Sequence, residues 1–211
     1  MIAMQSDATI KLLGAWQMDI LLEDEKSMFQ DYLDRELFNE RIIRLNEEIS
    51  AYTIDNVIPL IQLFNSKDEK EGTPVDKRKP IEIHISSPGG SAYDGWEVVS
   101  AIENSKTPVH TYVQGYAMSM ALPIYLAGHK KFLGKYATLL YHEIRGGIEG
   151  TRSETKRLGK EYDRLQHLYD SYITDRTSVK QETLDKYQEG IDDWYIGFED
   201  AEKYGFFDEV I

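Results

Sequence analysis

The feature that most constrains the fold is a regular alternation of apolar segments with strand and helix character in the middle of the chain. Strands are expected at residues 81–86, 109–113 and 137–141, and helices with one apolar face at residues 92–104 and 120–127. Strand–helix–strand order favours parallel strands joined by right-handed crossovers. The chain is therefore expected to have an α/β fold.

Before this core, residues 41–45 are expected to form a strand, and Thr53 to open a helix. Pro59 lies inside that helix, where it disturbs the hydrogen bonding of the first turns. The charged stretch Ser66–Lys79 contains a glycine and a proline and is expected to be a mobile surface loop. The apolar face of the helix is formed by Ile54, Val57, Ile58, Ile61 and Phe64.

After the core, Thr151 and Glu154 form a capping box that begins a long helix. A narrow apolar stripe follows it at steps of four and three residues. Its members are Leu158, Tyr162, Leu165, Tyr169 and Tyr172. The stripe suits packing on the chain's own core or on another subunit, and the pattern leaves both open. A second capping box, Ser178 with Gln181, begins a short helix that ends at Gly190.

Composition excludes several classes of function. The 211 residues, 41% of them hydrophobic, suit one compact domain. A net charge of −13 argues against nucleic acid or an anionic membrane as a partner. There is no cysteine for disulfides or thiol chemistry, no spacing typical of a metal site, and no cofactor is implied. Because the sequence has no run of about 20 apolar residues, we expect no membrane span. Because its N-terminal segment lacks a basic region, we expect no signal peptide. We therefore expect a cytoplasmic protein.

One serine, Ser119, lies in the short segment Gly115–Ala121, between an expected strand and an expected helix. A tight turn at this place presents a hydroxyl at a helix N-terminus, where free backbone N–H groups can receive an oxyanion. Serine is also a common N-cap, so the segment alone leaves a purely structural role open.

Two further residue types complete the set needed for nucleophilic catalysis. His142 follows the strand at 137–141, and Asp192 and Asp193 follow Gly190. An imidazole with a pKa near 6.5 can take a proton from a serine and return it to a leaving amine. A carboxylate orients that imidazole and stabilises its charged form. Each of these residues could instead be an ordinary strand-end or turn residue.

Four segments in this order resemble the ClpP family, the proteolytic subunits of Clp proteases. They are Ser87–Ser91, Ala117–Met120 with the following helix and Ala127–Gly128, Tyr141–Glu143, and Ala201–Ile211. The order and approximate spacing match from about Asn39 to the C-terminus. The resemblance implies a crotonase-type spiral of ββα units with a protruding handle helix. It divides the chain into an N-terminal segment, residues 1–38, at the axial entrance of a ring, and a protease domain, residues 39–211.

The resemblance also implies a serine endopeptidase that cleaves unfolded polypeptides within a ring chamber through an acyl-enzyme. Ser119 would be the nucleophile, His142 the base, and Asp193, rather than Asp192, the orienting acid. Backbone N–H groups of Gly90 and Met120 would form the oxyanion hole. The partners implied are six further copies in a heptameric ring, alone or stacked on a second ring, and a separate AAA+ unfoldase that uses ATP.

Several positions depart from the family pattern. Glu82 and His84 stand where aromatic residues usually form the docking pocket for an unfoldase, and Asn104 replaces a further aromatic. Asp192 replaces an arginine that links ring assembly to activity, and Glu143-Ile144 replaces the usual Gln-Pro. A pocket with charged side chains would not bury an apolar loop, so we expect weak docking of a standard unfoldase.

Two other functions remain open. The first is a crotonase-like enzyme that acts on acyl-CoA with an oxyanion hole and no serine nucleophile, which a fluorophosphonate label would distinguish. The second is a non-catalytic or regulatory subunit in a mixed ring, which the activity of the purified chain would test.

Overall fold

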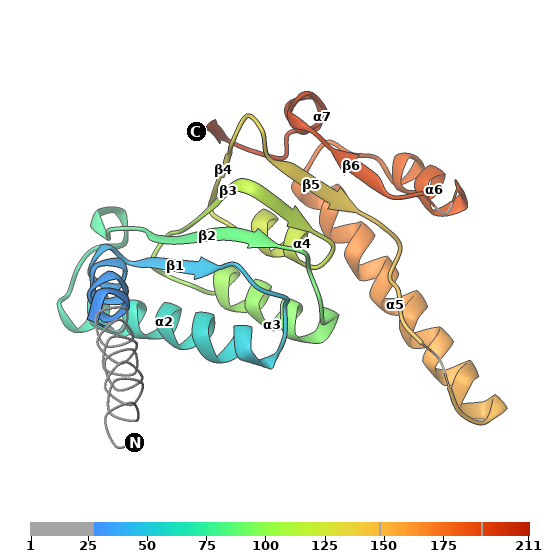
Figure 1. The fold of residues 1–211 in the computed structure, drawn as a ribbon, viewed down its shortest axis with the longest axis horizontal. Helices are drawn as coiled ribbons and strands as arrows, with labels where there is room; N and C mark the ends of the chain where they lie inside the picture. The colour runs from blue at the N-terminus through green and yellow to red at the C-terminus, as the bar shows by residue number, and fades with distance from the viewer. Residues whose placement is uncertain (1–27, 148, 191) are drawn as a thin grey trace, which may run out of the picture. The chain divides into compact units, whose positions relative to one another are not determined.

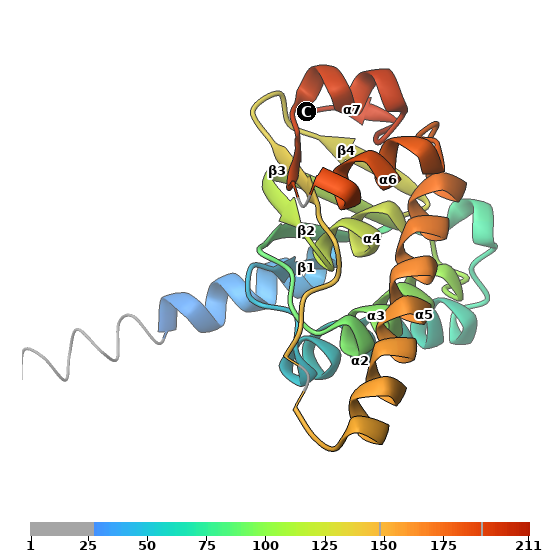
Figure 2. The same cartoon turned by 90° about the vertical axis from the view of Figure 1, so that its right-hand side faces the viewer.

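The computed structural model describes residues 28–147, 149–190 and 192–211, and the chain divides into two compact units, Met1–Arg41 and Ile42–Ile211. In the first unit, residues 28–40 form a helix. The remainder of the expected N-terminal segment lies outside the described residues, so its role at an axial entrance stays a prediction. The candidate site lies within the second unit, whose elements are shown in Figures 1 and 2.

In the described residues, seven strands form one sheet. Five of them are parallel neighbours in the order β1-β2-β3-β4-β7. Near its C-terminal end β3 also pairs in parallel with β5, which pairs antiparallel with β6. The strands are β1 Ile42–Leu45, β2 Ile81–Ser87, β3 Val109–Met118, β4 Lys130–Leu133, β5 Thr138–Tyr141, β6 Trp194–Ile196 and β7 Glu209–Val210.

Helices connect the parallel strands, as the sequence pattern predicts. The helices described in this unit are α2 Ala51–Lys70, α3 Ala92–Glu103, α4 Ala121–Leu126, α5 Arg152–Arg176, α6 Gln181–Gly190 and α7 Phe198–Tyr204, and a 3-10 turn is present at Val75–Lys77. α2, α3 and α4 lie against the same side of the sheet (Figure 1). The expected α/β spiral with a handle helix is confirmed.

The sheet has one covered face and one half-exposed face. Burial alternates along β2 and the first part of β3, so that every second side chain packs under the helices. Sheets of parallel strands are usually covered on both faces, which makes the half-exposed face of the parallel strands β2 and β3 unusual. The largest fully buried side chains are Tyr125, Tyr141, Phe206, Leu45, Ile49, Ile61, Ile81, Ile83, Ile102, Leu122, Ile124 and Leu126.

The predicted loop at Ser66–Lys79 is wrong in its first part. α2 continues to Lys70, and Asp68 on its last turns is buried. The hydroxyl of Thr107 donates to the Asp68 carboxylate at 2.7 Å, and the Lys106 ammonium pairs with Glu69 at 2.7 Å. These contacts with the loop before β3 stabilise helical turns that composition alone suggested were loop.

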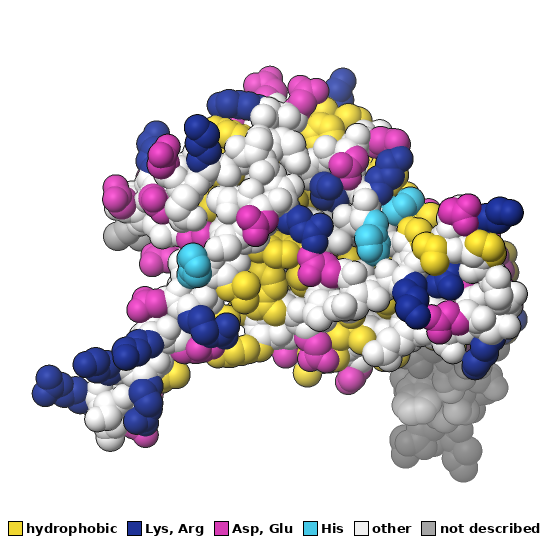
Figure 3. Space-filling model, turned by 180° about the vertical axis from the view of Figure 1, so that it is seen from behind, with side chains coloured by type: hydrophobic (Ala, Val, Ile, Leu, Met, Phe, Trp, Pro, Cys, Tyr) yellow, Lys and Arg dark blue, Asp and Glu magenta, His cyan; other side chains and the backbone are white. Residues whose placement is uncertain are grey.

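α5 begins at the capping box that the sequence predicts. The backbone N–H of Thr151 donates to Glu154 at 2.7 Å, and the Thr151 hydroxyl accepts from the Glu154 N–H. The N-terminal end of α5 extends beyond the sheet (Figures 1 and 2), and lysine and arginine side chains gather on it (Figure 3). Its exposed basic residues are Arg152, Lys156, Arg157 and Lys160.

The apolar stripe of α5 packs mainly on its own chain. Leu165 and Tyr169 are buried, and Tyr172 packs against the core with its ring edge-on to Trp96. Leu158, nearer the basic end, is 39% exposed. Of the two alternatives that the pattern left open, packing on the chain's own core is the one that these residues support.

Candidate active site

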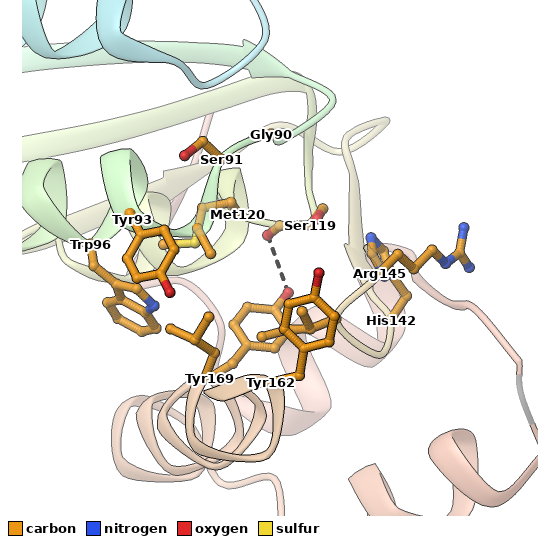
Figure 4. Close-up of a pocket in the computed structure, with 13 residues that line it drawn as sticks. Gly90, Ser91, Tyr93, Trp96, Ser119, Met120, His142, Arg145, Tyr162 and Tyr169 are labelled. Atoms are coloured by element: carbon orange, nitrogen blue, oxygen red, sulfur yellow. Dashed lines mark hydrogen bonds between the residues drawn. The ribbon is translucent and has the colours of Figure 1, made fainter. Parts of the chain in front are cut away.

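Ser119 occupies a strained turn between β3 and α4. Its φ is +51°, in the left-handed region that residues other than glycine adopt rarely and at an energetic cost. Its N–H donates to the carbonyl of Leu140 on β5 at 3.0 Å, and its carbonyl accepts from the Tyr169 hydroxyl of α5 at 3.1 Å (Figure 4). Hydrogen bonds to two other elements, β5 and α5, therefore fix this turn, as expected for a residue whose conformation serves a function.

The Pro-Gly-Gly turn after β2 lies directly against Ser119. A Cβ on Gly89 would lie only 2.5 Å from the Cβ of Ser119 and 2.9 Å from the nitrogen of Met120. A Cβ on Gly90 would lie 2.3 Å from the carbonyl oxygen of Ile49. Both glycines have positive φ. The missing side chain at Gly89 allows the glycine turn to approach the serine turn this closely, and the one at Gly90 makes room for the backbone of Ile49.

A pocket of about 370 Å³ opens beside Ser119. Gly90, Met120 and His142 also line it, so four of the five residues expected at the site share one cavity. Its remaining wall is largely aromatic and apolar, from α3, α5 and the chain after β5 (Figure 4). Those residues are Ser91, Ala92, Tyr93, Trp96, Ile144, Arg145, Tyr162, Leu165 and Tyr169.

His142 follows the last residue of β5 and is half-exposed. Its Nδ1 lies 2.5 Å from the carbonyl oxygen of Glu143, its neighbour in sequence. Among the described residues, no hydrogen bond joins His142 to Ser119 or to Asp193. The two residues of the proposed Ser–His pair thus line the same cavity without a hydrogen bond between them.

Asp193 lies between α6 and β6, and its carboxylate forms an ion pair with the guanidinium of Arg145. Its side chain is 26% exposed and that of Arg145 is 65% exposed. The backbone N–H of Asp192 donates to the backbone carbonyl of Tyr187 at 3.0 Å. Neither acid forms a hydrogen bond or ion pair with His142, so the assignment of Asp193 stays a prediction.

The sequence motifs do not indicate two further residues of the site. Arg145 belongs to no motif, although it is the one cation between His142 and the glycine pair Gly146-Gly147. The sequence pattern places Tyr169 only in the apolar stripe. Its burial, and then the neighbouring Tyr141 and Asp170, raise the pKa of its phenol well above the ordinary value, so its hydroxyl remains a donor to Ser119.

The described residues contain no group of three histidine, cysteine, aspartate or glutamate side chains that could bind a metal ion. Within the same residues, no helix is long and apolar enough to cross a membrane.

Comparison with known proteins gives a consistent assignment. The family model of the Clp protease matches residues 24–211. The ATP-dependent Clp protease proteolytic subunit of Bacteroides fragilis (strain ATCC 25285) is 30% identical over 217 residues, which cover 99% of this chain and 98% of that protein. The proteolytic subunit 2 of Synechococcus sp. (strain CC9605) is 29% identical over 178 residues, 83% of this chain and 85% of that protein. With the serine turn, the glycine turn and the histidine around one pocket, these matches place the chain in the Clp protease family.

Proposed function

We propose that the protein is a serine endopeptidase of the ClpP type that cleaves unfolded polypeptides. The observation that carries the proposal is the shared pocket, which is lined by a serine in a strained strand-to-helix turn, by a histidine, and by Gly90 and Met120, the proposed oxyanion donors. Substrate chains would enter this cavity as extended segments, with an apolar side chain against its aromatic wall.

In the proposed reaction, His142 takes the proton of the Ser119 hydroxyl as the oxygen attacks the scissile carbonyl carbon. The carbonyl oxygen becomes an oxyanion, which the N–H groups of Gly90 and Met120 stabilise. The C–N bond then breaks, and the proton passes from His142 to the leaving amine. Water repeats the sequence on the acyl-enzyme and releases the second product. No cofactor takes part in these steps.

Asp193 has to exchange Arg145 for His142 before it can orient the imidazole. The Arg145–Asp193 pair is partly exposed, and such pairs contribute about 1 kcal/mol or less to stability. Loss of this pair therefore costs little, and a rearrangement of the segment after β5, for example when subunits assemble, would release Asp193. The same ion pair is the observation that favours the alternative function, a non-catalytic subunit in a mixed ring.

The decisive variant is Ser119→Ala. The purified wild-type chain should react with a fluorophosphonate and cleave unstructured peptides, because only an activated serine does both. Ser119→Ala should lose the label and lower peptide cleavage by a factor of about 1000 or more, while its native mass and circular dichroism stay unchanged.

A wild-type chain that is inert alone, but becomes active when mixed with a second proteolytic subunit, would support the alternative. Cleavage by Ser119→Ala at the wild-type rate would exclude the mechanism.

A further inference from the structure

One buried carboxylate, that of Asp170 on α5, lies behind the segment that carries His142. Asp170 is 4% exposed. Its Oδ1 accepts from the Tyr141 hydroxyl at 2.7 Å and from the Gln166 amide at 2.8 Å. Its Oδ2 accepts from the amides of Gln188 at 2.8 Å and Gln181 at 3.3 Å. Four neutral donors from β5, α5 and α6 thus converge on one charge.

The carboxylate determines which way the Gln166 amide points. The Nε2 of Gln166 donates to Asp170, and its Oε1 accepts from the backbone N–H of Ile144 at 2.7 Å. An amide has one oxygen and one NH₂ group, and each bond requires the same orientation. Without the acceptor at Asp170, the amide could turn over and present its NH₂ group to the N–H of Ile144. The charge therefore secures a contact with the backbone two residues after His142.

A second hydrogen bond to Asp170, from the Tyr141 hydroxyl, holds the residue immediately before His142. Tyr141 is fully buried, and its hydroxyl donates to Asp170 while it accepts from the Gln188 amide at 2.6 Å. Burial, and next the Asp170 carboxylate, raise the pKa of the Tyr141 phenol, so the hydroxyl remains protonated and donates. The network thus binds the chain on both sides of a half-exposed imidazole.

The same carboxylate also reaches the helix that precedes the candidate acid. Gln188 lies near the end of α6, and Asp193 follows that end in the sequence. The N–H of Asp192 donates to the carbonyl of Tyr187 on the last turns of the helix. The end of β5 and the end of α6, which carry His142 and Asp193, are therefore both positioned relative to Asp170.

We propose that Asp170 and Gln166 are positioning residues that set the place of His142, an inference that rests on the proposed peptidase function. A buried carboxylate with only neutral donors is costly, and well-packed apolar residues of similar volume are often as stable or more so. The stabilisation of a defined geometry for His142 offsets that cost, because a displacement of about 1 Å at a reacting group can lower the rate by about 100-fold.

The test uses Gln166→Met, which keeps the length of the side chain and removes both hydrogen bonds. We expect kcat for an unstructured peptide, and the rate of fluorophosphonate labelling, to fall by about 10- to 100-fold with KM within about twofold of the wild-type value. Hydrogen exchange should become faster in residues 142–147, which include the N–H of Ile144. Gln62→Met, at an exposed site on α2, is the matched control and should match the wild type in all three measurements.

A conservative variant, Gln166→Glu, adds a signature that loss of stability alone would not produce. A protonated carboxyl can accept from Ile144 and donate to Asp170, as the amide does, whereas an ionised one repels Asp170. The kcat of Gln166→Glu, relative to that of the wild type at the same pH, should therefore rise as the pH is lowered.

The inference would be overturned if Gln166→Met were labelled by the fluorophosphonate at the wild-type rate, or if it changed KM without lowering kcat. It would also be overturned if the ratio of kcat for Gln166→Glu to that for the wild type did not depend on pH. These outcomes differ from failure of the proposed function, which would appear as cleavage that persists in Ser119→Ala.

Discussion

At the scale of single residues, the ion pair between Arg145 and Asp193 is the main difference between the expected and the observed site. Local motifs predicted the environment of Ser119, Gly90 and Met120, because a strand, a glycine turn and a helix start are readable in short stretches of sequence. The partner of Asp193 lies 48 residues away. No local pattern connects two such residues, since their contact depends on how the segment after β5 packs beside the end of α6.

Substitution of the two neighbouring acids tests the role of Asp193. Asp193→Asn should lower kcat by up to about 10,000-fold, because the imidazole loses the group that fixes its tautomer. Asp192→Asn should have a mild effect, and Arg145→Gln should not lower kcat, since it removes a cation that competes for Asp193. The measurement is peptide cleavage at a fixed enzyme concentration, with thermal unfolding as the control for stability. A large loss in Asp192→Asn alone would reverse the assignment.

At the scale of elements, periodicity and capping predicted the strands and helices that surround the site. The predictions are wrong or incomplete where tertiary contacts determine the secondary structure. α6 begins at Gln181 rather than after a cap at Ser178, whose N–H donates instead to Tyr204 at 2.8 Å. β4 is a four-residue strand with two lysines, and its pairing with β3 and β7 is what makes it a strand.

The outer face of β2 shows how charged residues replace an expected apolar pocket. The imidazole of His84 lies 3.0 Å from the Glu82 carboxylate and stacks on Tyr112 at 4.8 Å. Tyr112 in turn stacks on Phe132 at 4.3 Å. Aromatic surface is thus present on this half-exposed face, but it comes from β3 and β4, and its β2 side is the hydrogen-bonded pair of His84 and Glu82. An apolar loop that docked here would have to desolvate Glu82.

Docking of a generic Clp unfoldase is therefore expected to be weak. Small peptides should be cleaved without it, and a folded substrate should survive a mixture of the chain, the unfoldase and ATP. Replacing the pair, with Glu82→Tyr and His84→Tyr together, should strengthen co-sedimentation with the unfoldase, because the face becomes continuously aromatic. Tight binding by the unmodified chain would mean that the stacked rings of Tyr112 and Phe132 are sufficient for docking.

At the scale of the whole molecule, we expect a heptameric ring, and the charge distribution determines how its assembly responds to salt. Each chain has a net charge of −13, while the exposed end of α5 is basic. If two rings stack through α5, like charges on facing helices approach each other. Repulsion between the acidic bodies of neighbouring chains adds to this effect. Because α5 uses most of its apolar stripe within its own chain, little apolar surface remains there to offset the repulsion.

Native mass should therefore depend on ionic strength. The Debye length is about 30 Å at 0.01 M salt and about 8 Å at 0.15 M, so the repulsion is largely screened only at the higher value. We expect single rings or smaller species at low salt and larger assemblies at high salt. If assembly releases Asp193 from Arg145, peptidase activity should increase with the native mass. The measurement is native mass spectrometry together with peptide cleavage at both salt concentrations. A monomer that is fully active at micromolar concentration would contradict the ring, and a stacked form that is more stable at low salt would contradict the role given to charge.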